Sequence, residues 1–98
     1  MNGESSIFLN EKPVQALIKI RRTREDIYCS VVARKIDSTY AHTVKIIQEL
    51  EDEGYLTSEK KGRRKILELT EKGQDMAELF DRIVKSTHPE ASYYPVQA

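Results

Sequence analysis

The chain has 98 residues, zero formal net charge, and 39% hydrophobic against 33% charged residues, which is the balance of one small folded domain. No apolar run approaches the ~20 residues that a membrane-spanning helix needs, and Met1–Asn10 has neither the basic start nor the apolar stretch of a secretory signal. The single cysteine, Cys29, has no partner for an internal disulfide, so we expect a reducing compartment, the cytoplasm.

The zero net charge hides a segregation of charge along the sequence. Residues 37–54 hold one basic and five acidic side chains, whereas residues 55–70 hold five basic and two acidic ones. Residues 1–36 hold seven basic and four acidic side chains, and residues 71–98 hold three basic and five acidic ones. Because the local distribution of charge sets the field at the surface, the balanced total does not exclude nucleic-acid binding.

Composition predicts a flexible N-terminus over residues 1–9, a folded domain over residues 10–86 and a flexible tail over residues 87–98. Asn10 can cap a first helix of about three turns, in which Pro13 is tolerated because the first turn needs no amide donor. The apolar spacing places Val14, Leu17 and Ile18 on the inner face of this helix.

Two short segments and a longer helix follow. Ile27-Tyr28 favours extended backbone but is too short for a sheet of its own, and residues 30–36 predict a second helix. Ser38 and Thr39 are both good N-cap residues, so a third helix should begin there and end at Gly54. Its buried positions are expected to be Tyr40, Thr43 or Val44, Ile47 and Leu50.

A β-hairpin and a last helix complete the domain. Residues 55–58 and 65–69 predict two strands, with Gly62 at the tip between them. Thr70 can cap a fourth helix over residues 71–86. The sequence therefore predicts a mainly α domain with a small β-hairpin.

The turn between the second and third helices creates a helix-turn-helix, in which the third helix keeps one polar face. Near its N-terminus this face carries Ser38, Thr39, His42 and Lys45, whose side chains suit contacts to bases and phosphates in the DNA major groove. The acidic residues 49–53 must then point away from phosphates. Any amphipathic surface helix also has a polar face, so this feature alone favours DNA binding only weakly.

Five cations lie in six residues around the hairpin tip, namely Lys60, Lys61, Arg63, Arg64 and Lys65. Such a cluster repels itself and contributes little to folding, whereas opposite phosphates it releases counterions and adds affinity. A solvated loop is the alternative for an isolated basic tip. Directly after a helix-turn-helix, the cluster favours a nucleic-acid-binding wing.

Three segments in fixed order carry a family resemblance. They are Leu50-Glu51-Asp52-Glu53-Gly54-Tyr55-Leu56, Lys61-Gly62-Arg63-Arg64 and Leu69-Thr70-Glu71-Lys72-Gly73. Over residues 13–84 the chain resembles MarR-type winged helix-turn-helix transcriptional regulators, in the small form of archaeal or plasmid-borne members. The resemblance implies binding of double-stranded DNA as a homodimer, with the third helix in the major groove. It also implies recognition contacts from Ser38, Thr39, His42 and Lys45, and wing contacts from Arg63 and Arg64.

The apolar stripe of the fourth helix is wider than so small a domain needs for its own core, so we expect a shared use, in which its far end, Phe80 to Val84, pairs with the symmetry mate in a dimer. Its members are Met76, Leu79, Phe80, Ile83 and Val84. Packing of the same stripe against the first helix is the alternative. The longer terminal helices with which MarR-type proteins build a ligand pocket have no counterpart here, so we expect no small-molecule effector site.

The sequence therefore predicts a sequence-specific, dimeric transcriptional regulator, with a winged-helix protein-interaction module as the alternative. We expect no enzyme and no cofactor, since no nucleophile–base pair or phosphate-binding loop has a recognisable context. His42 and His88 are too few for a metal site. Cys29 is expected to be a partly buried small hydrophobe and not a redox sensor.

Overall fold

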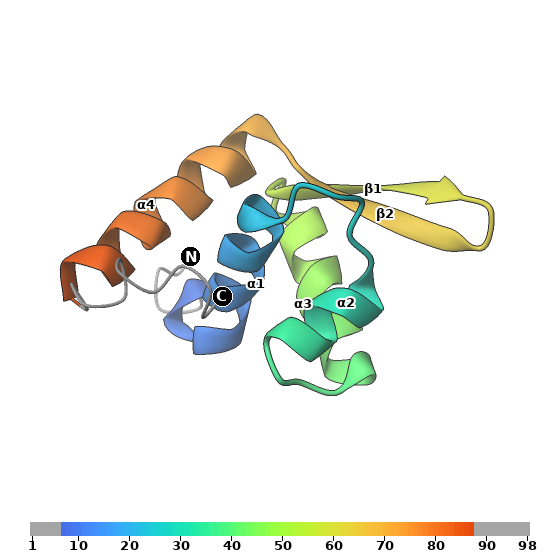
Figure 1. Ribbon diagram of the computed structural model, residues 1–98, viewed down its shortest axis with the longest axis horizontal. Coiled ribbons are helices and arrows are strands. Elements are labelled where there is room, and N and C mark those ends of the chain that lie inside the picture. The colour runs from blue at the N-terminus through green and yellow to red at the C-terminus, as the bar shows by residue number, and fades with distance from the viewer. Residues whose placement is uncertain (1–6, 88–98) are drawn as a thin grey trace.

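The chain folds as four helices and one antiparallel hairpin in the computed structural model, which describes residues 7–87 (Figure 1). A 3₁₀ turn, η2, precedes the first α-helix. The elements are η2 (Ile7–Leu9), α1 (Glu11–Arg22), α2 (Cys29–Lys35), α3 (Tyr40–Asp52), β1 (Leu56–Lys61), β2 (Arg64–Leu69) and α4 (Glu71–Thr87). This is the expected mainly α fold with a small hairpin, and it is a winged helix.

Both ends of the domain differ from the sequence prediction. Residues 7–9 belong to the fold, because Ile7 is buried and the ring of Phe8 lies 5.0 Å from that of Tyr55 and 5.1 Å from that of Phe80. The predicted flexible segment 1–9 is wrong for these three residues. At the other end, Thr87 closes α4, and the rest of the predicted tail, residues 88–98, lies outside the described residues, as do residues 1–6.

The helix starts follow from local capping, with one exception. Thr39 caps α3 by accepting the amide of His42 at 3.1 Å, and Thr70 caps α4 by accepting the amide of Gly73 at 3.0 Å. Asn10 occupies the N-cap position of α1 in extended backbone, but its side chain makes no capping hydrogen bond, so the predicted Asn10 cap is wrong in that respect.

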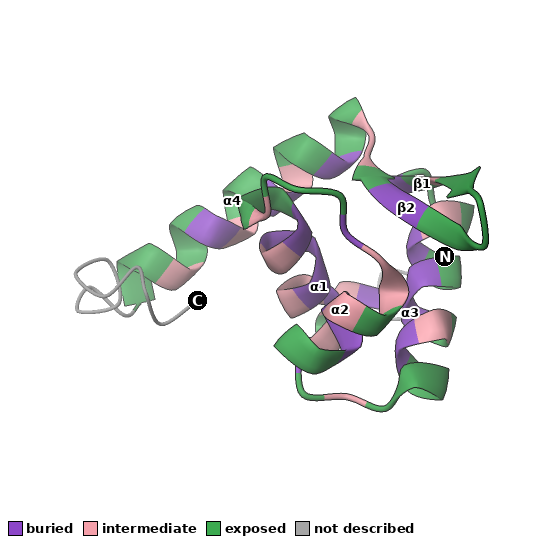
Figure 2. Ribbon diagram, turned by 45° about the vertical axis from the view of Figure 1, so that its right-hand side comes forward, coloured by how far each residue is buried: buried purple, intermediate pink, exposed green. Residues whose placement is uncertain are grey.

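The core lies between α1 and the other elements, as the buried residues that face inward in Figure 2 show. Leu17 of α1, Val32 of α2 and Leu50 of α3 are fully buried there. Leu56 of β1 and Ala77 of α4 close the core from the hairpin and the last helix. Burial of these side chains supplies the main favourable contribution to folding.

The hairpin is longer than predicted. Its register runs from Leu56 opposite Leu69 to Lys61 opposite Arg64, so that only two residues, Gly62 and Arg63, form the turn. Gly62 has φ +64°, a conformation that a glycine adopts without the steric cost of a Cβ. Both predicted strands stop short of the hairpin tip, because the basic residues were assigned to the loop. A strand tolerates exposed lysines, so β1 continues to Lys61 and β2 begins at Arg64.

Extended backbone before α2 lies beside the hairpin without forming a third strand. The amide of Leu67 donates to the carbonyl of Ile27 at 2.9 Å, and the sheet of the described residues contains only β1 and β2. The hydrogen bond ties the start of α2 to β2 and so fixes the hairpin relative to the helix-turn-helix.

A buried carboxylate joins α1 to α4. Asp81 is 4% exposed and accepts hydrogen bonds from Arg21 at 3.1 Å and from Arg22. The role of Asp81 is not visible in the sequence, because its partners lie 59 and 60 positions earlier. Because an unpaired buried charge is costly, the two arginines specify how α4 lies along α1.

A tight junction connects the end of α3 to the start of α4. The amide of Thr70 donates to the carbonyl of Tyr55 at 3.1 Å, and the Thr70 hydroxyl donates to the carbonyl of Gly54 at 2.6 Å. Gly73 lies so close that a Cβ at this position would be 1.9 Å from the Tyr55 carbonyl oxygen. Only glycine fits this position without a shift of the backbone.

We expect Gly73→Ala to destabilise the fold by about 2 kcal/mol or more, because the added methyl group must displace the backbone of Tyr55. The measurement is urea denaturation followed by circular dichroism. Gln74→Ala is the matched control, since Gln74 is exposed on the same helix and should change the free energy of unfolding by less than about 0.5 kcal/mol. Equal stability of Gly73→Ala and the parent chain would contradict the close backbone approach at this junction.

Candidate nucleic-acid interface

The outer face of α3 brings together the residues singled out in the sequence. Thr39, His42 and Lys45 are exposed, and Ser38 is half-buried. The Ser38 hydroxyl lies 3.0 Å from Nδ1 of His42, so one hydrogen bond fixes both side chains at the N-terminal end of the helix. This face offers hydroxyl, imidazole and ammonium groups to a partner.

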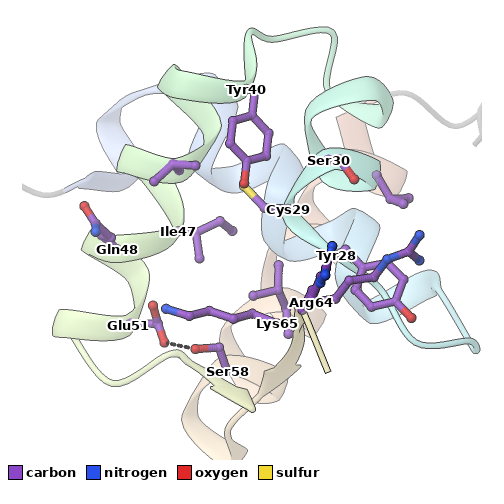
Figure 3. A pocket seen from close by; sticks show the side chains of 14 residues that line it. Tyr28, Cys29, Ser30, Tyr40, Ile47, Gln48, Glu51, Ser58, Arg64 and Lys65 are labelled. Atoms are coloured by element: carbon purple, nitrogen blue, oxygen red, sulfur yellow. Dashed lines mark hydrogen bonds between the residues drawn. The ribbon is translucent and has the colours of Figure 1, made fainter. Parts of the chain in front are cut away.

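The acidic end of α3 is separated from this group along the helix. Glu49, Asp52 and Glu53 are exposed at its C-terminal end, whereas Glu51 is half-buried and accepts a 2.7 Å hydrogen bond from Ser58 of β1 (Figure 3). Glu51 therefore has a structural role, because its hydrogen bond holds β1 against α3.

Tyr40 was predicted to be buried, and this prediction is wrong. Tyr40 is 61% exposed, because it is the first residue of α3 and lies beyond the part of the core that Thr43, Ile46 and Ile47 fill. Its side chain lies instead beside Cys29, over a groove between α2, α3 and the hairpin (Figure 3). An aromatic side chain is thereby added to the exposed face of the helix.

The cations of the hairpin are all exposed and are divided between its two faces. Lys60 is directly opposite Lys65, and Lys61 is directly opposite Arg64. Like charges placed opposite each other destabilise a strand pair. Arg63, in the turn, completes the cluster. The repulsion between these cations does not stabilise the hairpin. An anionic partner would relieve it, so the cluster favours binding of an anion.

Arg64 also has a structural contact. Its guanidinium lies 4.8 Å from the centroid of the Tyr28 ring, a cation–π geometry (Figure 3). Tyr28 is the N-cap residue of α2, so the contact ties the tip half of β2 to the helix-turn-helix. This pair is not predictable from the sequence, because its members are 36 positions apart in the chain.

A groove of about 620 Å³ lies between the start of α2, α3 and the hairpin, and we call it the wing groove (Figure 3). Ser30, Tyr40, Gln48 and Lys65 are among the polar side chains that line it. Gln48 was missed in the sequence, although its position three residues after Lys45 places it on the same helical face. The wing groove lies between the two elements singled out as candidate DNA contacts.

Cys29 is half-buried and lines the wing groove. Burial raises the pKa of its thiol, which lowers the fraction of reactive thiolate at neutral pH. The described residues contain no group of three or more His, Cys, Asp or Glu side chains that could hold a metal ion. His88 lies outside the described residues. No helix of residues 7–87 is long and apolar enough to cross a membrane.

The apolar stripe of α4 is divided between the core and the surface. Met76 and Phe80 pack against the core, and Val84 is half-buried. Leu79 and Ile83 are 49% and 55% exposed and form the outer edge of the stripe. One edge of the stripe therefore packs against the core, and the other edge is exposed and available for a dimer interface.

We expect iodoacetamide to alkylate Cys29 at pH 8 at least about fivefold more slowly than an unstructured cysteine peptide, because burial raises its thiol pKa. The rate should rise as the pH is increased further and more thiolate forms. The same chain unfolded in urea is the control and should react at the peptide's rate. A folded-state rate equal to that of the peptide would favour the redox-sensor interpretation instead.

Most of this chain is similar, in sequence and in structure, to protein from Archaeoglobus fulgidus. An uncharacterised protein of Archaeoglobus fulgidus is 30% identical over 81 residues, which cover 80% of this chain and 85% of the relative. The crystal structure of AF1382 from Archaeoglobus fulgidus superposes with a TM-score of 0.77 at 29% identity, covering 81% of this chain and 90% of that one.

Larger regulators share the fold. The transcriptional regulator SlyA superposes with a TM-score of 0.75 at 19% identity, over 85% of this chain and 60% of its own. MepR, a transcription regulator of Staphylococcus aureus, gives 0.74 at 16% identity, over 86% and 64%. The DUF6293 C-terminal winged helix domain matches residues 13–81. The chain therefore belongs to the DUF6293 C-terminal winged helix domain family.

Proposed function

We propose that this protein is a transcriptional regulator that binds duplex DNA sequence-specifically as a homodimer. The observation that carries the proposal is the uncovered polar face of α3 beside a hairpin with five exposed cations. Structural neighbours that are transcription regulators support it, and one neighbour is a MepR variant bound to an oligodeoxyribonucleotide. The same neighbours support the proposed kinship with MarR-type regulators.

In the proposed complex, the N-terminal half of α3 enters the major groove. Ser38 and Thr39, just before α3, and His42 and Lys45 in its first half would face base edges, and Gln48, three residues beyond Lys45, extends this group past the middle of the helix. Gln is suited to two hydrogen bonds with adenine. The exposed acidic residues at the other end of α3 favour a tilt that keeps this end away from phosphates.

The wing supplies the phosphate contacts of the proposed complex. Lys60, Lys61 and Arg63 are exposed cations without an ion pair in the described part of the chain. Arg64, which belongs to the same proposed set, is stacked on Tyr28 and would contribute chiefly by holding the wing in place. Phosphate contacts provide affinity that is independent of sequence, so specificity would come from α3.

Salt dependence tests the wing. We expect Arg63→Ala to reduce the slope of log affinity against log salt by about one, because one phosphate contact is lost. Tyr28→Ala should lower the affinity and leave the slope unchanged, because it removes the support of Arg64 without removing a charge. Fluorescence anisotropy with a labelled duplex gives both values, and Tyr28→Phe, which keeps the ring, is the control. Absence of DNA binding at low salt would refute the proposed function and favour a protein-interaction module.

Sequence selection tests α3. We expect His42→Ala and Gln48→Ala to change which fragments are recovered from a random DNA library, since each removes a base-facing group. Arg63→Ala should leave the selected sequence unchanged and only weaken binding. Identical selected sequences for all three variants would contradict the assignment of specificity to α3.

Substitutions at the exposed edge of the α4 stripe test the proposed dimer. We expect Leu79→Glu combined with Ile83→Glu to give a monomer in analytical ultracentrifugation at micromolar concentration, because charges would enter an apolar interface. Arg82→Glu, at an exposed position of the same helix, should leave the mass unchanged. A dimer of this kind would present two recognition helices about 34 Å apart and select a pseudo-palindromic site. A monomeric parent chain would refute the proposed dimer.

A further inference from the structure

A second groove lies away from the candidate nucleic-acid interface, and we call it the basic groove. It has a volume of about 480 Å³, within the range of small-molecule sites. It is lined by α1, by the end of α2 with the turn that follows it, and by Val84 near the end of α4. It shares no lining residue with the wing groove.

Its ionisable side chains are strongly unbalanced in sign. Four cations line the basic groove, Lys12, Lys19, Arg22 and Lys35, against one carboxylate, Asp37. The side-chain amide of Gln15, which also lines it, donates to Glu11 at 2.9 Å and is therefore already occupied. Four cations from two helices converge on one concave surface, which favours occupation by an anion.

Two of these cations already have partners in the fold. Lys12 donates to the carbonyls of Ile36 at 2.5 Å and Asp37 at 3.3 Å, so it braces the turn before α3. Arg22 is paired with the buried carboxylate of Asp81. The side-chain ammonium groups of Lys19 and Lys35 make no hydrogen bond or ion pair with any residue in the range 7–87. Their ammonium groups remain available to a ligand.

The electrostatics of Lys19 show that the cations act on one another. Partial burial lowers the pKa of its ammonium, and the positive charges of Arg22 and Lys35 lower it further. An anion placed between Lys19 and Lys35 would relieve this repulsion. Two ammonium groups are best balanced by a ligand that carries two negative charges.

We propose that the basic groove binds a small organic phosphate ester. A phosphate monoester carries close to two negative charges at neutral pH, and lysines bind phosphate as point charges. The one guanidinium in the groove is committed to Asp81, so the paired donors that select a carboxylate are not free. Ile18, Ile36 and Val84 give the groove an apolar part that suits the organic portion of the ester.

Phenyl phosphate is the probe, added to the full chain while amide signals are followed by ¹H–¹⁵N NMR and affinity by calorimetry. We expect saturable binding with shifts concentrated in residues 12–22 and 35–37, and weaker binding of inorganic phosphate, which lacks the apolar part. Lys19→Gln with Lys35→Gln should reduce the affinity about tenfold or more, since two charge-assisted hydrogen bonds are lost.

Arg82→Gln is the matched control, because it removes one exposed cation on α4 that does not line the groove, and it should change the affinity less than about twofold. Shifts of equal size in the hairpin, or equal loss of affinity in Arg82→Gln, would overturn the proposal in favour of unspecific anion binding. Absence of phenyl phosphate binding, with loss of DNA affinity in the double lysine variant, would assign the groove to the DNA backbone. Because the readout is phosphate binding, the result does not depend on the proposed function.

Discussion

The fold depends on the junction between residues 53–55 and residues 70–73. Here the amide and hydroxyl of Thr70 bond to the backbone of Tyr55 and Gly54, and Lys72 donates to the carbonyl of Glu53 at 2.7 Å. The Lys72 ammonium also lies 4.4 Å from the centroid of the Tyr55 ring. The junction closes the base of the hairpin at the point where α3 ends and α4 begins. α3, the hairpin and α4 are thereby held in one fixed arrangement.

The same junction gives a physical meaning to the sequence resemblance. Two of the three segments that carry it contain its two sides, Glu53-Gly54-Tyr55 and Thr70-Glu71-Lys72-Gly73. These residues take part in close backbone approach and in capping within the fold. The segments therefore identify a fold, and function has to be argued from the exposed residues of α3 and the hairpin.

Features set by neighbours along the chain were predictable from the sequence. The helix order, the Thr39 and Thr70 caps and the turn at Gly62 depend on a few adjacent residues, and they were predicted. Features set by distant residues were not. The sequence could not show that Asp81 pairs with α1, that Arg64 lies on Tyr28 or that η2 joins the core, because each depends on contacts made only after the helices pack. Among the candidate contacts of α3, helical spacing alone would have added Gln48.

The two-stranded sheet has a consequence for the behaviour of the molecule in concentrated solution. One edge of the hairpin is partly covered, because β2 bonds to Ile27, whereas β1 has no further strand beside it among residues 7–87. An uncovered edge is a template for pairing with another chain, and lysines are one of the means by which proteins prevent such aggregation. Lys60 and Lys61 lie on this strand. The cations proposed to contact DNA phosphates would also keep the hairpins of separate molecules apart, so that replacing them with neutral residues would promote aggregation in addition to weakening the proposed DNA binding.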